Sequence, residues 1–117
     1  MNPKYYDLYS GLVRPHVLHH ASREPVFGLG MIQELNRHGY KLGPGTMYPL
    51  LQGMEKRGWL KSSKQKVSQR SRRVYVATHA GRQALKTGQE RVRELFEEIT
   101  ADAVTSNASL NGCRHIM

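Results

Sequence analysis

Residues 43–51, Gly43-Pro44-Gly45-Thr46-Met47-Tyr48-Pro49-Leu50-Leu51, predict a helix with one apolar face and one uncharged polar face. Pro44 suits the first helical position, where the N–H that proline lacks would have no partner anyway. Apolar side chains then follow with the i, i+3, i+4, i+7 spacing of one helical face: Met47, Leu50, Leu51 and Met54. The opposite face carries small, hydroxyl and amide groups that can approach a nucleic-acid groove closely, among them Thr46, Tyr48 and Gln52.

Three helices are predicted in the first half of the chain, over residues 6–22, 28–38 and 44–57. Gly39 and Gly58 end the second and third helices, because glycine takes the positive φ of a helix C-cap at little cost. Pro15 lies inside the first helix, which therefore either kinks there or begins late. The apolar residues at helical spacing are Leu8, Leu12, Val13, Val17 and Ala21 in the first helix and Leu29, Ile32 and Leu35 in the second.

After Gly58 the pattern changes from helical to extended. Residues 59–67 and 73–77 are predicted strands, and the polar residues 68–71 between them make a hairpin the simplest interpretation. Between residues 61 and 73 the charged side chains are all cations: Lys61, Lys64, Lys66, Arg70, Arg72 and Arg73. Such a hairpin repels itself unless a polyanion neutralises it.

Thr78 is the expected N-cap of a long helix over residues 79–103. A helix of about 25 residues is roughly 37 Å long, more than a three-helix domain can cover. Its apolar seam therefore predicts a homodimer, with contacts through Leu85, Val92, Leu95, Phe96 and Ile99. The predicted domains are a DNA-binding domain over 1–78, a dimerisation helix over 79–104 and a disordered tail over 105–117.

Three helices followed by a two-stranded hairpin are the plan of a winged helix-turn-helix. The expected fold is thus mainly α with a small β-hairpin, plus the C-terminal helix. In this plan the second helix packs across the third, and the third presents its N-terminal half to the major groove of DNA. The N-terminus of the third helix also offers N–H groups and a positive dipole end to a phosphate. The hairpin lies beside it as a wing.

Composition limits the remaining classes of function. The chain has 117 residues and a formal net charge of +9, which favours a polyanionic partner. A single cysteine, Cys113, supplies neither a disulfide framework nor a cysteine zinc site. No apolar run approaches the ~20 residues that span a bilayer, and no apolar segment follows the N-terminus as it does in a signal peptide. We expect a cytoplasmic protein with no membrane partner.

Several segments together resemble the PadR family of bacterial transcriptional regulators. They are Phe27-Gly28-Leu29, residues 43–51, Glu55-Lys56-Arg57-Gly58, Arg72-Arg73-Val74-Tyr75 and Thr78-His79-Ala80-Gly81-Arg82. The resemblance covers residues 7–100 and implies a winged-helix domain, dimerisation through one C-terminal helix as in the short subfamily, and repression by operator binding. Two positions depart from the family pattern: Gly43 stands where a serine N-cap is frequent, and Pro15 interrupts the first helix.

The DNA-binding residues that we expect lie in the third helix, in the turn before it and in the wing. They are Thr46, Tyr48, Gln52, Lys41, Lys64, Lys66, Arg70, Arg72 and Arg73. The alternative for these side chains is an ordinary solvated face, but six cations without a counter-charge favour phosphate contact. A small-molecule or metal effector is expected to release the operator. Its candidate pocket residues are Tyr5, Tyr6 and Tyr9, although aromatic residues at an assembly seam more often serve packing.

Other functions find less support in the sequence. His16 and His20 can share a helical face, but without a third ligand they are only a weak candidate for metal binding. The chain has no Gly-rich phosphate loop in a strand-turn-helix frame and no Ser/His/Asp arrangement, so we expect neither an enzyme nor a cofactor. Two alternatives stay open: a winged helix that docks an acidic protein partner, and a metal-sensing regulator that uses His16 and His20.

Overall fold

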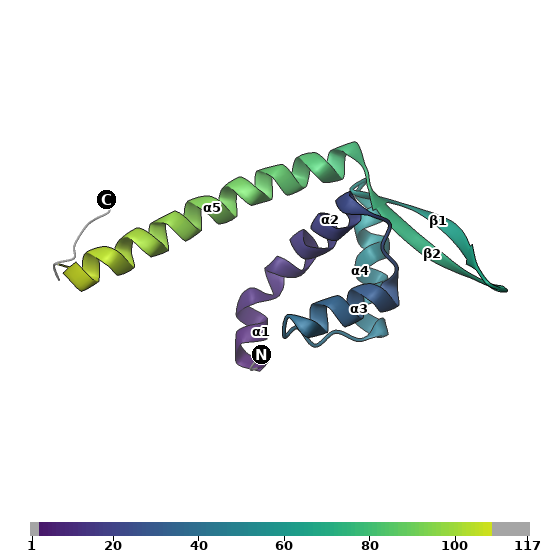
Figure 1. The fold of residues 1–117 in the computed structure, drawn as a ribbon, viewed down its shortest axis with the longest axis horizontal. Coiled ribbons are helices and arrows are strands. Elements are labelled where there is room, and N and C mark those ends of the chain that lie inside the picture. The colour runs from purple at the N-terminus through teal and green to yellow at the C-terminus, as the bar shows by residue number, and fades with distance from the viewer. Residues whose placement is uncertain (1–2, 109–117) are drawn as a thin grey trace. The chain divides into compact units, whose positions relative to one another are not determined.

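The computed structural model describes residues 3–108, and for residues 3, 67 and 103–108 it describes the backbone alone. The elements in chain order (Figure 1) are α1 (Pro3–Tyr9), the 3-10 helix η1 (Ser10–Leu12), α2 (Val13–Arg23), α3 (Gly28–Arg37), α4 (Pro44–Lys56), β1 (Leu60–Val67), β2 (Arg70–Ala77) and α5 (His79–Ala108). This order confirms the predicted fold class. Contacts divide the chain into two compact units, Met1–Leu85 and Lys86–Met117. The first unit includes the start of α5, which the predicted division at residue 78 assigns to the dimerisation helix.

The first predicted helix is in fact two α-helices joined by a 3-10 turn. Of the two alternatives for Pro15, the late start is correct, because α2 begins at Val13. Pro15 is the third residue of α2, where an N–H has no acceptor within the helix. Leu8 and Leu12 are 68% and 40% exposed, because the 3-10 turn breaks the helical register before the packed face begins. The buried residues of α2 are Val13, Val17, Leu18 and Ala21.

α3 and α4 form the helix-turn-helix pair, and their buried faces meet in the core. The fully buried residues of α4 are Met47, Leu51 and Met54, as their spacing predicts. The buried residues of α3 are Gly28, Met31, Ile32 and Leu35. Leu29 was expected on this face but is 53% exposed. Met31 is buried instead, because the buried positions 28, 31, 32 and 35 follow the i, i+3, i+4, i+7 spacing of one helical face.

Glycine ends both helices of the pair, as predicted. Gly39 follows α3 with a φ of 94°, and Gly58 follows α4 with a φ of 85°. Side chains with a Cβ rarely adopt such positive φ values. In the turn between the helices, Asn36 Oδ1 accepts the N–H of Leu42 at 3.1 Å, and the Asn36 carbonyl accepts the N–H of Gly39 at 3.0 Å. These bonds fix the turn that leads into α4.

The wing is an antiparallel hairpin whose strands pair from its base to Val67 and Arg70 at its tip. The turn has only two residues, 68–69, so β2 begins at Arg70 and not at residue 73 as predicted. The error has a physical cause: residues 70–73 are all exposed, and no alternation of apolar side chains marks this part of the strand. Figure 1 shows the hairpin extending away from α2, α3 and α4.

Val26 ties the segment before α3 to the base of the wing. Its N–H donates to the Tyr75 carbonyl at 2.9 Å, and its carbonyl accepts the Tyr75 N–H at 2.7 Å. Both side chains are buried. The start of α3 is therefore held next to β2.

Thr78 is the N-cap of α5, as predicted. Its Oγ1 accepts the N–H of Gly81 at 3.0 Å and donates to the Gly58 carbonyl at 2.5 Å. The backbone N–H of Thr78 donates to the Trp59 carbonyl at 3.0 Å, and the Trp59 ring packs against the core. One short segment thus links the end of α4, the base of the wing and the start of α5.

α5 is longer than predicted. It runs to Ala108, so residues 105–108, expected in the tail, belong to the helix. The remainder of the predicted tail, Cys113 included, lies outside the described residues. Within the described residues, no helix combines the length and the apolar character needed to cross a membrane.

Candidate nucleic-acid interface

The uncharged face of α4 is exposed. Thr46, Tyr48 and Gln52 lie on this face, and Tyr48 is 43% exposed. The opposite face is anchored in the core, so this face is presented on a rigid element. Gly43 precedes the helix in an extended conformation and gives it no side-chain cap. The positive end of the helix dipole is consequently not offset by a capping side chain, which favours an anion from outside the chain.

A cleft of about 550 Å³ lies between the start of α3, α4 and β2. Its lining residues are Phe27, Gly28, Leu29, Tyr48, Gln52, Arg70, Ser71, Arg72, Arg73 and Tyr75. The fold thus brings two of the predicted base-reading residues together with three of the predicted phosphate-binding arginines. Thr46 is exposed on α4 but does not line the cleft.

Two glycines at the start of α3 make room for aromatic rings in this cleft. Gly28 lies against the ring of Tyr48, where a Cβ would collide. A Cβ on Gly30 would come within 3.1 Å of the Phe27 ring. Phe27 in turn stacks on Arg72, whose Cζ is 3.6 Å from the ring centroid. We did not predict Phe27 and Gly28 as site residues, and their only sequence signal was their place in the family resemblance.

A chain of hydrogen bonds links the wing to α4. Glu55 of α4 accepts both the N–H and the hydroxyl of Ser62 on β1, at 3.0 Å and 2.8 Å. Arg73 of β2 donates to the same hydroxyl oxygen at 2.9 Å. Hydrogen bonds to a charged group are stronger than those between neutral groups. Arg73 therefore helps to hold the hairpin as well as lining the cleft.

The predicted lysines lie outside the cleft. Lys41, Lys64 and Lys66 are all exposed and do not line it. In the hairpin register Lys64 lies directly across from Arg73. Like charges in this position destabilise a strand pair, so an anion beside them would relieve a repulsion. Among the described residues, no salt bridge neutralises a wing cation.

The predicted dimer residues do not share one environment. Leu85 belongs to the first compact unit and is half-buried against its core. The other four are exposed residues of the second unit: Val92 (50%), Leu95 (55%), Phe96 (66%) and Ile99 (58%). Their i, i+3, i+4, i+7 spacing places these four on one face of α5.

The three tyrosines proposed for an effector pocket also differ. Tyr6 packs against the core, with its ring edge-on to Tyr40 at a centroid distance of 6.2 Å. Tyr5 and Tyr9 are 56% and 45% exposed. None of the three lines the cleft beside α4. Their role in effector binding stays a prediction.

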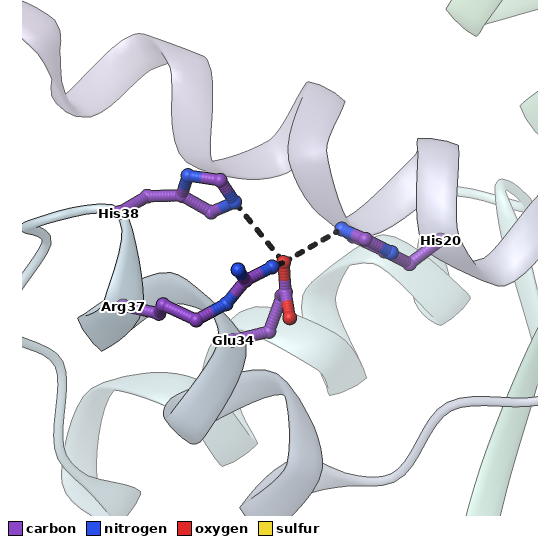
Figure 2. Close-up of polar contacts among 4 residues, drawn as sticks. All are labelled: His20, Glu34, Arg37 and His38. Atoms are coloured by element: carbon purple, nitrogen blue, oxygen red, sulfur yellow. Dashed lines mark hydrogen bonds and ion pairs between the residues drawn. The ribbon is translucent and has the colours of Figure 1, made fainter.

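One of the two histidine candidates, His20, lies beside Glu34 together with Arg37 and His38 (Figure 2). The Oε2 atom of Glu34 is 2.8 Å from Arg37 Nη2, 3.0 Å from His38 Nε2 and 3.6 Å from His20 Nε2. The ring centroid of His16 is 5.1 Å from that of His38. Glu34 is far from His16 and His20 in the sequence, and the packing of α3 on α2 brings its carboxylate beside His20.

The contact between His20 and Glu34 joins α2 to α3, and it is ionic only when His20 is protonated. Burial lowers the pKa of His16 and His20, and Glu34 opposes that effect only in part. A hydrogen bond from Arg37 lowers the pKa of Glu34. In the described part of the chain, no group of three or more His, Cys, Asp or Glu side chains is arranged to hold a metal ion.

The chain is similar to known transcriptional regulators in both sequence and fold. The profile of the Transcriptional regulator PadR-like family matches residues 17–87. Transcriptional regulator Rv3488 of Mycobacterium tuberculosis (strain ATCC 25618 / H37Rv) is 48% identical over 87 residues, which are 74% of this chain and 81% of that protein.

Two solved structures show the same fold. The PadR family transcriptional regulator from Eggerthella lenta has a TM-score of 0.72 and 26% identity, over 84% of this chain and 87% of that one. The PadR-like transcriptional regulator from Bacillus cereus has a TM-score of 0.71 and 25% identity, over 92% of this chain and 99% of that one. The chain belongs to the PadR-like family of transcriptional regulators, whose members bind DNA and are not enzymes.

Proposed function

We propose that the protein is a homodimeric repressor that binds operator DNA and leaves it when a small-molecule or metal effector binds. The observation that carries the DNA-binding mode is the cleft beside α4, where Tyr48 and Gln52 meet the arginines of β2. Uncharged hydroxyl and amide groups suit base edges, and guanidinium groups suit phosphates. The proposed DNA partner also makes the cytoplasm the expected compartment.

The uncharged face of α4 and the cations of the wing and of the turn before α4 have different tasks in this proposal. Thr46, Tyr48 and Gln52 contact base edges in the major groove, where an amide such as that of Gln52 matches adenine. The cations give affinity without regard to sequence, by binding phosphates and releasing counterions. They are Lys41, Lys64, Lys66, Arg70, Arg72 and Arg73.

The homodimer is supported by the exposed apolar face of α5, formed by Val92, Leu95, Phe96 and Ile99. An apolar face of this kind is normally covered in a stable assembly. A two-fold symmetric dimer binds two half-sites whose centres are about 10 base pairs apart, or a multiple of that spacing. The operator is therefore expected to be an inverted repeat.

Replacing two wing arginines tests the DNA-binding mode. Arg70→Ala combined with Arg72→Ala should weaken binding to every duplex by roughly tenfold and lower the slope of log K against log salt by ~0.9 per lost phosphate contact. Fluorescence anisotropy with a random duplex and with the protein's own upstream region measures both quantities. Arg91→Ala with Arg93→Ala on α5 is the matched control, because it removes the same charge outside the wing.

The control pair should leave affinity and salt slope close to those of the wild type. If the wing pair behaves like the control pair, the wing does not contact DNA. A winged helix that docks an acidic protein predicts a different result, namely no retention on duplex DNA and no steep salt dependence. Retention on a random-duplex column at low salt separates these two functions.

The effector requires its own experiment. A thermal-shift screen with aromatic acids and divalent metals finds ligands that stabilise the folded protein, because a ligand that binds only the folded state raises its stability. A true effector must also lower operator affinity in the anisotropy assay. If no compound changes both quantities, the effector part of the proposal is lost and the DNA-binding part stands.

A further inference from the structure

Arg72 and Phe27 form a stacked pair at the wall of the cleft. The guanidinium Cζ lies 3.6 Å from the centroid of the Phe27 ring, well within the range of a cation–π interaction. The two residues are far apart in sequence, and Phe27 directly precedes α3 while Arg72 lies on β2. Packing in the hydrophobic core does not account for where these two side chains lie, because Phe27 is half-buried and Arg72 is exposed.

The backbone holds this pair from both sides. The carbonyl of Phe27 accepts the N–H of Met31 in the first turn of α3 at 2.9 Å. The preceding residue, Val26, exchanges two hydrogen bonds with Tyr75 of the strand that carries Arg72. Gly30 has no side chain, and this leaves room for the Phe27 ring beside it. The backbone that carries Phe27 is therefore held beside β2 by hydrogen bonds within the chain.

Stacking leaves the edge of the Arg72 guanidinium available. A guanidinium that lies flat on a ring keeps its N–H groups in one plane, and these can grip a phosphate with two parallel hydrogen bonds. Within the described residues, Arg72 forms no salt bridge with a carboxylate. Arg73 differs, since it donates to Ser62. The residue across from Arg72 in the hairpin is Gln65, which adds no like charge.

We infer that Phe27 is a positioning residue for DNA binding. Its ring holds the Arg72 guanidinium at the wall of the cleft, so that the free N–H edge binds a phosphate of the strand lying between α4 and the wing. Phe27 acts through Arg72 and does not itself contact DNA. This inference rests on the proposed DNA-binding function of the cleft and adds a residue that the family resemblance does not assign a role.

A double-mutant cycle tests the inference. Phe27→Leu removes the aromatic face and keeps an apolar side chain, Phe27→Tyr keeps the face, and Arg72→Gln removes the charge. Each variant, and Phe27→Leu combined with Arg72→Gln, is titrated with a fixed duplex at several salt concentrations. Leu12→Ala is the matched control, because it trims a 40% exposed apolar side chain that does not line the cleft.

The expected pattern is specific. Phe27→Leu weakens binding about two- to fivefold, the size of an exposed cation–π pair, and lowers the salt slope in the direction of Arg72→Gln. In the Arg72→Gln background, Phe27→Leu changes neither the DNA affinity nor the salt slope any further. Phe27→Tyr and Leu12→Ala bind DNA like the wild type. Circular dichroism at the assay temperature shows that each variant is folded.

Three results would overturn the inference. The first is that Phe27→Leu lowers DNA affinity equally in the wild-type and the Arg72→Gln backgrounds, which would show that the ring acts only on the fold. The second is that Phe27→Tyr lowers DNA affinity as much as Phe27→Leu does. The third is unchanged binding in Phe27→Leu while the Arg70→Ala, Arg72→Ala pair loses affinity, in which case the proposed function stands and the positioning role does not. If the wild-type protein binds no duplex at low salt, the proposed DNA-binding function and the positioning role of Phe27 are both overturned.

Discussion

Gly81 lies in the first turn of α5 and is buried against the carbonyl oxygen of Trp59 and the side chain of Leu18. A Cβ at this position would collide with the Trp59 backbone, and a backbone group cannot swing aside as the end of a side chain can. The same carbonyl accepts the N–H of Thr78. The lack of a side chain at Gly81 thus allows the start of α5 to pack against Trp59 at the base of the wing.

Gly81→Ala should destabilise the protein by about 1–3 kcal/mol, the usual cost of overpacking a site that cannot relax. Gly53→Ala in α4 is the matched control, since nothing lies within 4 Å of a Cβ there. An alanine in a helix interior is favoured over glycine by about 0.5–1 kcal/mol, so the control should gain stability. Urea denaturation of the two variants measures the difference. Equal stabilities would show that the contact with Trp59 is not tight.

Single residues differ in how far the sequence reveals their role. Gly39, Gly58 and Thr78 could be predicted, because a helix end has local chemistry that depends on neighbours in the chain. The need for glycine at Gly28 and Gly81 could not, because it arises from Tyr48 and Trp59, which only the folded chain brings close. Phe27 was missed for the same reason.

At the scale of elements, the link between α2 and α3 depends on groups that titrate. Burial lowers the pKa of His16 and His20 below the ordinary value of 6.5. As the pH falls through 6.5, the unfolded chain therefore takes up protons that the folded chain does not, and the folded state loses stability. Glu34 also has a lowered pKa, so its contribution is present above its ordinary value of 4.5 and is lost at more acid pH.

The free energy of unfolding should therefore fall as the pH drops through about 6.5, and fall again as it drops below about 4.5. His16→Gln should flatten the first decrease, because glutamine does not titrate. His79→Gln changes an exposed histidine at the start of α5 and serves as the control. Chemical denaturation at a series of pH values measures the effect. If His16→Gln shows the same decrease as the control, His16 does not contribute to it.

The first and last residues of elements with a buried face could be predicted from the sequence. The ends of elements without a buried face could not. α4 has three fully buried residues at helical spacing, and its start and end agree with the sequence to within one residue. The tip of the wing has no buried face, so the predicted strand β2 began three residues too late, at residue 73 instead of Arg70. Pairing across the hairpin, and not burial, decides that Arg70 and Arg72 lie on a strand.

At the scale of the whole molecule, charge predicted the class of partner but not the shape of the site. The net charge of +9 and the six wing cations indicate a polyanion in any arrangement. Which cations lie beside α4 depends on the hairpin register and on the bond between Glu55 and Ser62. The sequence therefore predicted a DNA-binding winged helix, while the cleft and its arginine stack needed the folded chain.

The second compact unit carries the last prediction, which concerns assembly. α5 has 30 residues, and the exposed side chains of Val92, Leu95, Phe96 and Ile99 share one of its faces. Leu95→Glu combined with Ile99→Glu should prevent self-association, because two carboxylates in an apolar seam lose their hydration without gaining a partner. Analytical ultracentrifugation should then show a monomer, and affinity for an inverted-repeat duplex should fall because the two half-sites are no longer bound together.

Thr87→Glu with Ala101→Glu is the matched control for the dimer, since it adds the same charge on the opposite face of α5, where both residues are exposed. This control should remain a dimer and bind the inverted repeat like the wild type. The affinity of both variants for a single half-site should be equal, because the wing and α4 are unchanged. A dimeric Leu95→Glu, Ile99→Glu variant would show that copies of the chain meet through another surface, and that this apolar face serves a different contact.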